Sequence, residues 1–198
     1  MPDYSREKEV SEKGYKFICG VDEAGRGPLA GPVCAAAVIM PEDTDIPGLN
    51  DSKKLSEKKR EALFPIICQK AVSYCIAYAT VEEIEEHNIL NATFLAMNRA
   101  IEGLGIKADY ALVDGNRVPK DCPVPVTTVV KGDSLSMSIA AASILAKVSR
   151  DRLMLELDKE YPQYNFAKHK GYGTAEHMEL IRKHGISPCH RPSFLKKL

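Results

Sequence analysis

The residues best suited to chemistry in this sequence are four acidic side chains, each placed just after a predicted strand. With the strand that each follows in parentheses, they are Asp22 and Glu23 (16–21), Asp114 (110–113) and Asp133 (125–130). In open α/β sheets, sites form beyond the carboxyl ends of strands. If the first and fourth strands are neighbours, these carboxylates converge and repel one another, and hard divalent cations relieve such repulsion. The pattern favours a site for two such ions, roughly 3.5–4 Å apart, that displaces a phosphodiester.

Each carboxylate also has an ordinary structural explanation. Asp133 would cap a helix predicted to begin at Ser134, and Asp114 followed by glycine is typical of a turn. An acidic pair at a strand end is usually solvated. Three predicted strands nevertheless lead to an acidic residue, and no other arrangement in the chain suggests chemistry. The joint placement therefore favours a metal site over four separate structural roles.

A glycine-rich segment, Gly25–Gly31, begins one residue after the first acidic pair. Its Gly-x-Gly-x-x-x-Gly spacing, with Pro28 and Pro32 beside the glycines, differs from the dinucleotide fingerprint, and a strand is predicted after it where that fingerprint requires a helix. The chain also has no GxxxxGK[ST] phosphate loop and no arrangement typical of a covalent nucleophile. The glycines do allow a ligand to approach the backbone closely.

The elements that must position these residues form a mixed α/β pattern. Strands are predicted over 16–21, 33–39, 72–81, 110–113 and 125–130, and helices from Ser56, over 82–87 and 91–104, from about Ser134 to about Glu160 and over 174–184. The first three strands can pair as an antiparallel meander, and helices separate the last two from them, as parallel connections require. Residues 1–14 are predicted to be a frayed polar extension. Residues 15–198 would form one domain, including a helical C-terminal segment from about residue 160.

Composition limits the class of protein. The chain has 198 residues, 44% of them hydrophobic and 27% charged, which is typical of one globular domain. Its longest apolar run, Val33–Met40, is far shorter than the about 20 residues of a membrane helix, and no secretory signal opens the chain. Six scattered cysteines without metal-binding spacing indicate reduced core thiols. We therefore expect a cytoplasmic protein that does not contact a membrane or bind zinc.

Charge is balanced overall but unevenly distributed. The 27 basic residues equal the 27 acidic ones, which argues mildly against nucleic-acid binding through bulk charge. Basic residues nevertheless gather in three stretches, at 53–60, 168–170 and 183–197. A single such run is usually a solvated surface. Three runs in a neutral chain indicate that charge is segregated into local patches.

Several motifs follow one another along the chain in a recognisable order. They are Gly20–Pro28 (GVDEAGRGP) with Gly31-Pro32-Val33, Asp51–Leu55 (DSKKL), Asn88-Ile89-Leu90 with Ala96-Met97, Val113-Asp114-Gly115, Lys131-Gly132-Asp133 with Ser138–Ile144 (SIAAASI), Ala146-Lys147 and Arg150-Asp151, and Lys170–Thr174 (KGYGT) with His177, His190-Arg191 and Phe194. Together they resemble the motifs of the prokaryotic ribonuclease HII family. The resemblance covers about residues 16–198 without a detectable gap, and six motifs in order are highly specific.

This resemblance implies a fold and a reaction. The fold would be the ribonuclease H-like α/β fold, a five-stranded mixed sheet flanked by helices with a small C-terminal helical part. Asp22, Glu23, Asp114 and Asp133 would be the catalytic ligands of two Mg²⁺ or Mn²⁺ ions. One ion would activate a water for in-line attack on phosphorus, and the other would stabilise the leaving 3′-oxygen. The family hydrolyses the RNA of RNA–DNA hybrids and nicks duplex DNA 5′ of an embedded ribonucleotide, leaving 3′-hydroxyl and 5′-phosphate ends.

The resemblance also implies the substrate-binding residues. The backbone of the Gly25-Arg26-Gly27 turn would sense the 2′-hydroxyl, the group that distinguishes RNA from DNA. Tyr172 would pack on the sugar of the following nucleotide, although a tyrosine between glycines is otherwise typical of a turn. Lys53 and Lys54 would contact phosphates and add salt-dependent affinity without reading sequence, although loop lysines are usually just solvated.

The expected partners are RNA–DNA hybrids and duplex DNA that contains ribonucleotides, and nothing in the sequence demands more than a monomer. The segment Ser193–Leu198 is a weak candidate for a sliding clamp contact, and terminal packing is the stronger interpretation. Two other classes of protein stay open. A non-catalytic nucleic-acid-binding module on this fold would have lost carboxylates, whereas all four are present. Another two-metal phosphoesterase, such as an exonuclease or a junction resolvase, would lack the Gly-Arg-Gly and Lys-Gly-Tyr-Gly motifs and would cleave all-DNA duplexes.

Overall fold

The computed structural model describes residues 1–196 and has a five-stranded mixed sheet at its centre. In chain order the strands are β1 (Ile18–Ala24), β2 (Val33–Ile39), β3 (Ser73–Ala79), β4 (Tyr110–Asp114) and β5 (Val126–Val129). Their spatial order is β3-β2-β1-β4-β5, with β1, β2 and β3 antiparallel and β1, β4 and β5 parallel. The predicted meander and the predicted parallel connections are both confirmed.

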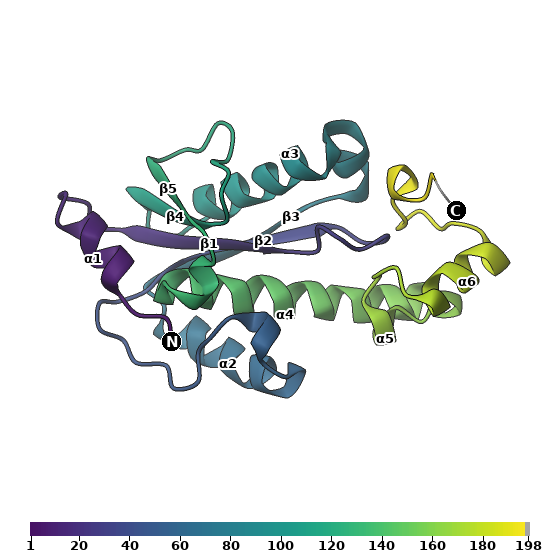
Figure 1. Ribbon diagram of the computed structural model, residues 1–198, viewed down its shortest axis with the longest axis horizontal. Helices are drawn as coiled ribbons and strands as arrows, with labels where there is room; N and C mark the ends of the chain where they lie inside the picture. The colour runs from purple at the N-terminus through teal and green to yellow at the C-terminus, as the bar shows by residue number, and fades with distance from the viewer. Residues whose placement is uncertain (197–198) are drawn as a thin grey trace.

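Helices cover both faces of the sheet (Figure 1). The helices are α1 (Ser5–Ser11), α2 (Glu57–Lys70), α3 (Val81–Glu102), α4 (Met137–Glu160), α5 (Phe166–His169) and α6 (Ala175–His184). Helix α3 packs on one face, while α4, backed by α2, packs on the other. Every residue of β2 is buried, since its side chains alternate between these two apolar layers.

Small side chains bring α4 close to the strands that carry the acidic residues. Ala140, Ala141 and Ala142 are fully buried against the sheet. In β1, a Cβ added at Gly20 would lie 2.1 Å from the backbone carbon of Ser138, so only glycine fits there. The start of α4 is therefore held directly against β1, two residues before Asp22.

The start of α4 differs from the prediction. The helix begins at Met137, and the Ser136 hydroxyl caps it by accepting a hydrogen bond from the N–H of Ile139 (3.2 Å). Asp133 lies before it, in a separate 3₁₀ turn over Gly132–Ser134. The ordinary role considered for Asp133, capping a helix that begins at Ser134, is therefore wrong.

The N-terminal segment forms a docked helix, so the expectation of a frayed extension is wrong. The Glu7 side chain is buried, and its Oε1 accepts hydrogen bonds from the hydroxyls of Ser136 and Ser138, both at 2.6 Å. The backbone of Asp3 also pairs with the segment at Leu135–Met137. These partners lie about 130 residues away in sequence, so local composition could not reveal them.

The interior of α3 agrees with the prediction, whereas the strand ends differ from it. The helices predicted over 82–87 and 91–104 are both present within α3, which is kinked at Asn88 by a non-helical backbone conformation (φ +64°). Strands β1 and β4 run further than predicted and include Asp22, Glu23 and Asp114 within their last residues. The acidic side chains are thus fixed by strand pairing, and do not lie in loops after the strands.

Residues after α4 form a small helical part around the C-terminal portion of that helix, and its apolar cluster includes Met154 of α4 and Ala30 (Figure 1). It contains α5, α6 and 3₁₀ turns over Pro162–Tyr164 and Pro192–Phe194. The Thr174 hydroxyl caps α6, as the predicted helix over 174–184 required. No helix among residues 1–196 is long and apolar enough to cross a bilayer, and all six cysteines are free.

Candidate active site

Three carboxylates meet where β1, β4 and the start of α4 come together. Asp22 lies in β1 and Asp114 ends β4, the parallel neighbour of β1 in which Val113 pairs with Val21. Asp133 comes from the turn between β5 and α4. One oxygen from each of the three carboxylates lies within 4.8 Å of the others. The convergence expected from neighbouring parallel strands is therefore present.

Glu23 lies beside this group and is not a member of it. Successive residues of a strand point to opposite faces, so Glu23 is directed away from Asp22. Its Oε1 lies 3.4 Å from Nη1 of Arg26, and together with Asp114 these residues line a small pocket. Asp114 therefore borders two acidic positions, one shared with Asp22 and Asp133 and one shared with Glu23.

The carboxylates are poorly compensated. Burial, followed by repulsion from Glu23 and Asp114, raises the pKa of Asp22 well above its ordinary value. Burial and repulsion from Asp114 likewise raise the pKa of Asp133. Asp22, Asp114 and Asp133 form no ion pair with any side chain in the described part of the chain. A largely buried set of hard oxygen donors without an ion-pair partner suits a divalent cation.

Two lysines border the acidic group from the loop before α2. Burial disfavours the Lys53 ammonium, but attraction to carboxylates, chiefly Asp22 and Asp133, outweighs it and raises the pKa of Lys53. Lys54 Nζ lies 3.1 Å from the hydroxyl of Ser134, the residue after Asp133. The 3₁₀ turn at Ser52–Lys54 thus places both predicted phosphate-binding lysines at the edge of the carboxylate group.

The two other predicted substrate-binding motifs lie against each other. The N–H of Leu29 donates a hydrogen bond to the carbonyl of Gly171 (2.8 Å), which joins the two turns. A Cβ added at Gly27 would lie 3.9 Å from Cε1 of Tyr172, so the exposed ring stands beside the open backbone of the first turn. The structure therefore brings Gly25, Arg26, Gly27 and Tyr172 together next to the end of β1.

Two buried arginines hold these turns. Arg150 in α4 and Arg191 near the C-terminus have no exposed surface, and both donate hydrogen bonds to backbone carbonyls of the glycine-rich segment. Sequence reasoning included both residues in motifs but gave neither a role. An arginine within the buried small-residue stretch of α4 was an available signal for Arg150, whereas nothing local marked Arg191.

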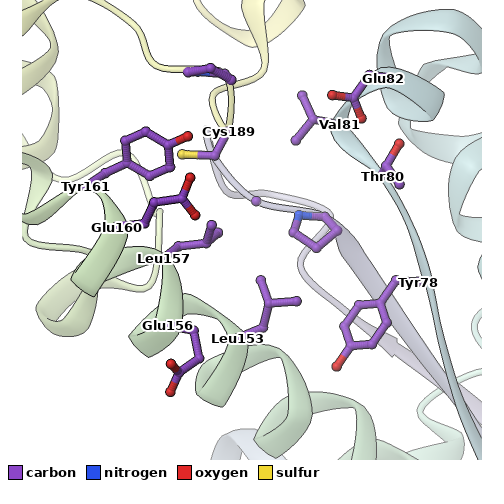
Figure 2. A pocket seen from close by; sticks show the side chains of 13 residues that line it. Tyr78, Thr80, Val81, Glu82, Leu153, Glu156, Leu157, Glu160, Tyr161 and Cys189 are labelled. Atoms are coloured by element: carbon purple, nitrogen blue, oxygen red, sulfur yellow. The ribbon is translucent and has the colours of Figure 1, made fainter.

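A separate groove of about 520 Å³ lies between α4 and the junction of β3 with α3. Figure 2 shows Leu153, Leu157 and Tyr161 along one side and Tyr78, Thr80 and Val81 along the other. None of the four acidic residues lines it. The four acidic residues therefore lie outside this apolar groove.

Comparison with known proteins decides the family. The model of the family described as ribonuclease HII matches residues 19–197. The chain belongs to the ribonuclease HII family. A ribonuclease HII of Clostridioides difficile (strain 630) is 56% identical over 192 residues, which cover 97% of this chain and 75% of that protein.

Solved structures agree with this assignment. The ribonuclease H2 of Pyrococcus horikoshii OT3 superposes with a TM-score of 0.74 at 28% identity, over 90% of this chain and 93% of that one. The ribonuclease HII in the PCNA complex from Archaeoglobus fulgidus gives a TM-score of 0.70 at 26% identity, over 89% and 94%. The ribonuclease H-like fold is thus confirmed. As a member of this family, the protein is a divalent-metal-dependent nuclease that hydrolyses the RNA strand of RNA–DNA hybrids.

Proposed function

We propose that this ribonuclease HII also incises duplex DNA on the 5′ side of an embedded ribonucleotide, by two-metal-ion hydrolysis that leaves 3′-hydroxyl and 5′-phosphate ends. The observation that carries the proposal is a cluster of acidic residues without ion-pair partners, which includes Asp22 of the strand that leads into an open glycine turn, with an exposed tyrosine against that turn. The acidic group suits metal-dependent phosphodiester chemistry. The turn and the ring suit recognition of a single sugar, which is all that distinguishes an embedded ribonucleotide from its neighbours.

Asp22, Glu23, Asp114 and Asp133 would hold the two divalent cations, Mg²⁺ or Mn²⁺. Asp114 lies between the two acidic positions, so its carboxylate is placed to serve both. When bound, the cations would activate a water for in-line attack on phosphorus and stabilise the leaving 3′-oxygen. Burial and repulsion between carboxylates raise the pKa of Asp22 and Asp133, and the repulsion favours cation binding, because a bound cation would relieve it.

The remaining residues would position the substrate. The exposed backbone of Arg26 and Gly27 would approach the 2′-hydroxyl, and Tyr172 would pack on the sugar of the following nucleotide. Lys53 and Lys54 would contact phosphates on the other side of the carboxylates. Phosphate contacts add affinity without sequence preference, which suits an enzyme that must act on ribonucleotides in any context.

The test is cleavage of a labelled DNA duplex that contains one ribonucleotide, with Mg²⁺ or Mn²⁺. The wild type is expected to cut on the 5′ side of the ribonucleotide, and Asp22→Asn is expected to abolish the cut. Asp45→Asn is the matched control, because Asp45 is exposed and lies outside the site. Binding of Mn²⁺, measured by calorimetry, should weaken in Asp22→Asn and stay unchanged in Asp45→Asn.

The same assay separates the alternatives. Cleavage of an all-DNA duplex by the wild type would favour a different two-metal phosphoesterase on this fold. An intact ribonucleotide duplex, together with uncut RNA–DNA hybrid, would favour a non-catalytic binding module. Equal activity of Asp22→Asn and the wild type would contradict the proposed metal ligands.

A sliding clamp contact through Ser193–Leu198 belongs with these proposals. The Archaeoglobus fulgidus structure is a complex of ribonuclease HII with PCNA. In this chain the Ser193 hydroxyl donates to Glu85 (2.7 Å) and Phe194 packs against the core, so a clamp would have to displace them or use the following residues. Lys197 and Leu198 lie outside the described residues. Calorimetric titration of a purified clamp into the protein with and without residues 195–198 tests the contact.

A further inference from the structure

The guanidinium of Arg191 donates hydrogen bonds only to backbone carbonyls of the segment Gly25–Gly31. Its side chain has no exposed surface. Nε donates to the carbonyl of Gly31, Nη1 to those of Arg26 and Pro28, and Nη2 to those of Gly25 and Gly31, at 2.6–3.1 Å. All five N–H donors of the side chain are therefore occupied by the glycine-rich segment.

These contacts give the turn a definite polarity. The carbonyls of Gly25, Arg26 and Pro28 point inward to the guanidinium. The N–H groups of Arg26 and Gly27 donate to no residue in the described chain, and both residues are exposed. In a trans peptide the N–H points away from the carbonyl of the preceding residue, so the inward carbonyls of Gly25 and Arg26 direct the N–H groups of Arg26 and Gly27 outward. Those N–H groups could donate hydrogen bonds to the oxygen of a sugar hydroxyl.

Arg150 links this turn to the turn that carries Tyr172. Its Nη2 donates to the carbonyl of Ala30 and its Nη1 to that of Lys170, both at 3.0 Å. The same guanidinium lies 6.0 Å from the centre of the Tyr172 ring. One side chain from α4 thus contacts both turns and adds to the Leu29–Gly171 hydrogen bond that joins them.

We propose that Arg191, assisted by Arg150, is a positioning residue for recognition of the ribose. Arg191 fixes the carbonyls of Gly25, Arg26, Pro28 and Gly31 inward so that the N–H groups of Arg26 and Gly27 face the 2′-hydroxyl, and Arg150 helps to fix their distance from Tyr172. This inference rests on the proposed incision at ribonucleotides. It adds that the preference for ribose over deoxyribose depends on a side chain that does not touch the substrate.

The guanidinium is the group that this role requires. A buried carbonyl without a donor is unfavourable, and four carbonyls around one point need several donors in one plane. Arginine offers five such donors in a rigid fork, whereas lysine offers three on a flexible stem. Lysine at this position should therefore hold part of the turn, and an apolar side chain of similar length should hold none of it.

The test measures binding, because binding separates recognition from chemistry. In an Asp22→Asn background, the Kd of each variant is measured with Mg²⁺ for an all-DNA duplex and for the same duplex with one ribonucleotide. Arg191→Met is expected to lower the ratio of the two Kd values by about tenfold, the effect of losing one or two well-placed hydrogen bonds. Arg191→Lys is expected to lower it less. Affinity for the all-DNA duplex should stay within about twofold, and Arg182→Met, an exposed arginine in α6, is the control.

Hydrogen exchange provides the second measurement. The N–H groups of Leu29 and Gly31, bonded to the carbonyls of Gly171 and Cys189, should exchange faster in both Arg191 variants, while β1 stays protected. A folded Arg191 variant with the wild-type Kd ratio, or with unchanged exchange in the turn, would overturn the inference. If Arg191→Met fails to fold, Arg191→Lys provides both measurements. A wild type without any preference for the ribonucleotide would instead overturn the proposed function, and unchanged exchange would then still decide against the positioning role.

Discussion

At Tyr172 the contribution of the aromatic ring to substrate binding can be measured separately from that of the hydroxyl. The ring is 42% exposed beside Gly27, and its hydroxyl donates to no residue in the described chain. Packing on a sugar needs only the ring. We therefore expect Tyr172→Phe to keep the KM for a ribonucleotide-containing duplex. Tyr172→Ala should raise that KM about five- to tenfold, as expected for losing roughly 1 kcal/mol of apolar contact.

Steady-state kinetics on the same duplex measures both variants. Neither Tyr172 variant changes the cluster of Asp22, Asp114 and Asp133, so the Mn²⁺ affinity of both should equal that of the wild type. Equal KM values for Tyr172→Ala and Tyr172→Phe would show that the ring makes no substrate contact.

Gly25 is expected to tolerate no side chain. Its φ of +99° is unfavourable for other residues, and an added Cβ would lie 2.0 Å from Nε of Arg150. Gly25→Ala should lower the free energy of unfolding by about 2–3 kcal/mol and reduce incision at a ribonucleotide. Gly14→Ala is a matched control, because Gly14 has nearly the same φ (+97°) and no atom within 4 Å of the added Cβ.

Urea denaturation and the incision assay give the two readouts. The control should lose only the backbone contribution, about 1 kcal/mol, with incision unchanged. A similar loss in both variants would mean that the contact with Arg150 is unimportant.

At the scale of elements, helix α1 depends on one buried carboxylate. Oε1 of Glu7 accepts hydrogen bonds from both serine hydroxyls at the start of α4 and from the N–H of Ser138 (3.0 Å). Glu7→Ala leaves these buried donors without their acceptor and should lower the free energy of unfolding by about 2 kcal/mol. The exposed Glu9, paired with Arg6 on the same helix, is the control, and Glu9→Ala should change it by less than about 0.5 kcal/mol.

Chemical denaturation measures both variants, and limited proteolysis shows whether α1 has detached. An undocked α1 should be cleaved within its first turns in Glu7→Ala and stay resistant in Glu9→Ala. Equal stability of the two variants would mean that Glu7 does not anchor the helix.

Predictability from sequence differed between elements for physical reasons. The meander, the parallel pair and α6 followed from local patterns, because alternation, caps and glycine stops act within a few residues. Helix α1 could not be predicted, since its anchor lies in α4. The true cap of α4 was also missed, because Ser136 and Asp133 are equally good caps by type and only packing against β1 decides between them.

The site divides in the same way. Convergence of Asp22 with Asp114 follows from parallel pairing of β1 with β4, which the sequence order of strands and helices indicates. The separation of Glu23 from that group follows from strand alternation, which was not applied to it. The roles of Arg150 and Arg191 could not be predicted, because their partners are backbone carbonyls. Every residue has a backbone carbonyl, so the residue types do not indicate which ones an arginine contacts.

At the scale of the whole molecule, buried histidines tie the C-terminal part to the tyrosine turn. The N–H of Ser187 donates to Nδ1 of His190 (3.0 Å), which leaves Nε2 of His190 as the donor to Nε2 of His177 (3.1 Å). Nδ1 of His177 then donates to the carbonyl of Tyr172 (2.9 Å). Only neutral rings satisfy this chain, because a second proton on His177 would face the N–H of His190.

Stability should therefore fall in acid. Burial, with repulsion from His177, lowers the pKa of His190 to about 4, and burial lowers the pKa of His177 as well. In the unfolded chain these groups titrate near pH 6.5. Between about pH 6.5 and pH 4 these histidines bind more protons in the unfolded state, so their contribution to the free energy of unfolding decreases as pH falls through this window. Above it both states are neutral and the histidines contribute no pH dependence.

Urea denaturation between pH 7.5 and pH 4.5 checks this expectation. His190→Gln should be less stable at pH 7.5 and should show a shallower decline toward acid. His87→Gln, at a histidine that is 46% exposed, should keep the wild-type slope. An unchanged slope in His190→Gln would contradict the neutral-histidine chain.

The contact between Arg191 and the glycine turn also bears on how the chain is made. Ribosomes add residues from the N-terminus at about 5–20 per second, and Arg191 is added 160 residues after Gly31. For roughly 10–30 s of synthesis the carbonyls of the turn have no guanidinium to bind them. A nascent chain can therefore pair β1 with β2 early. If Arg191 positions the glycine turn as proposed, the surface that reads the ribose can be completed only at a late stage of synthesis.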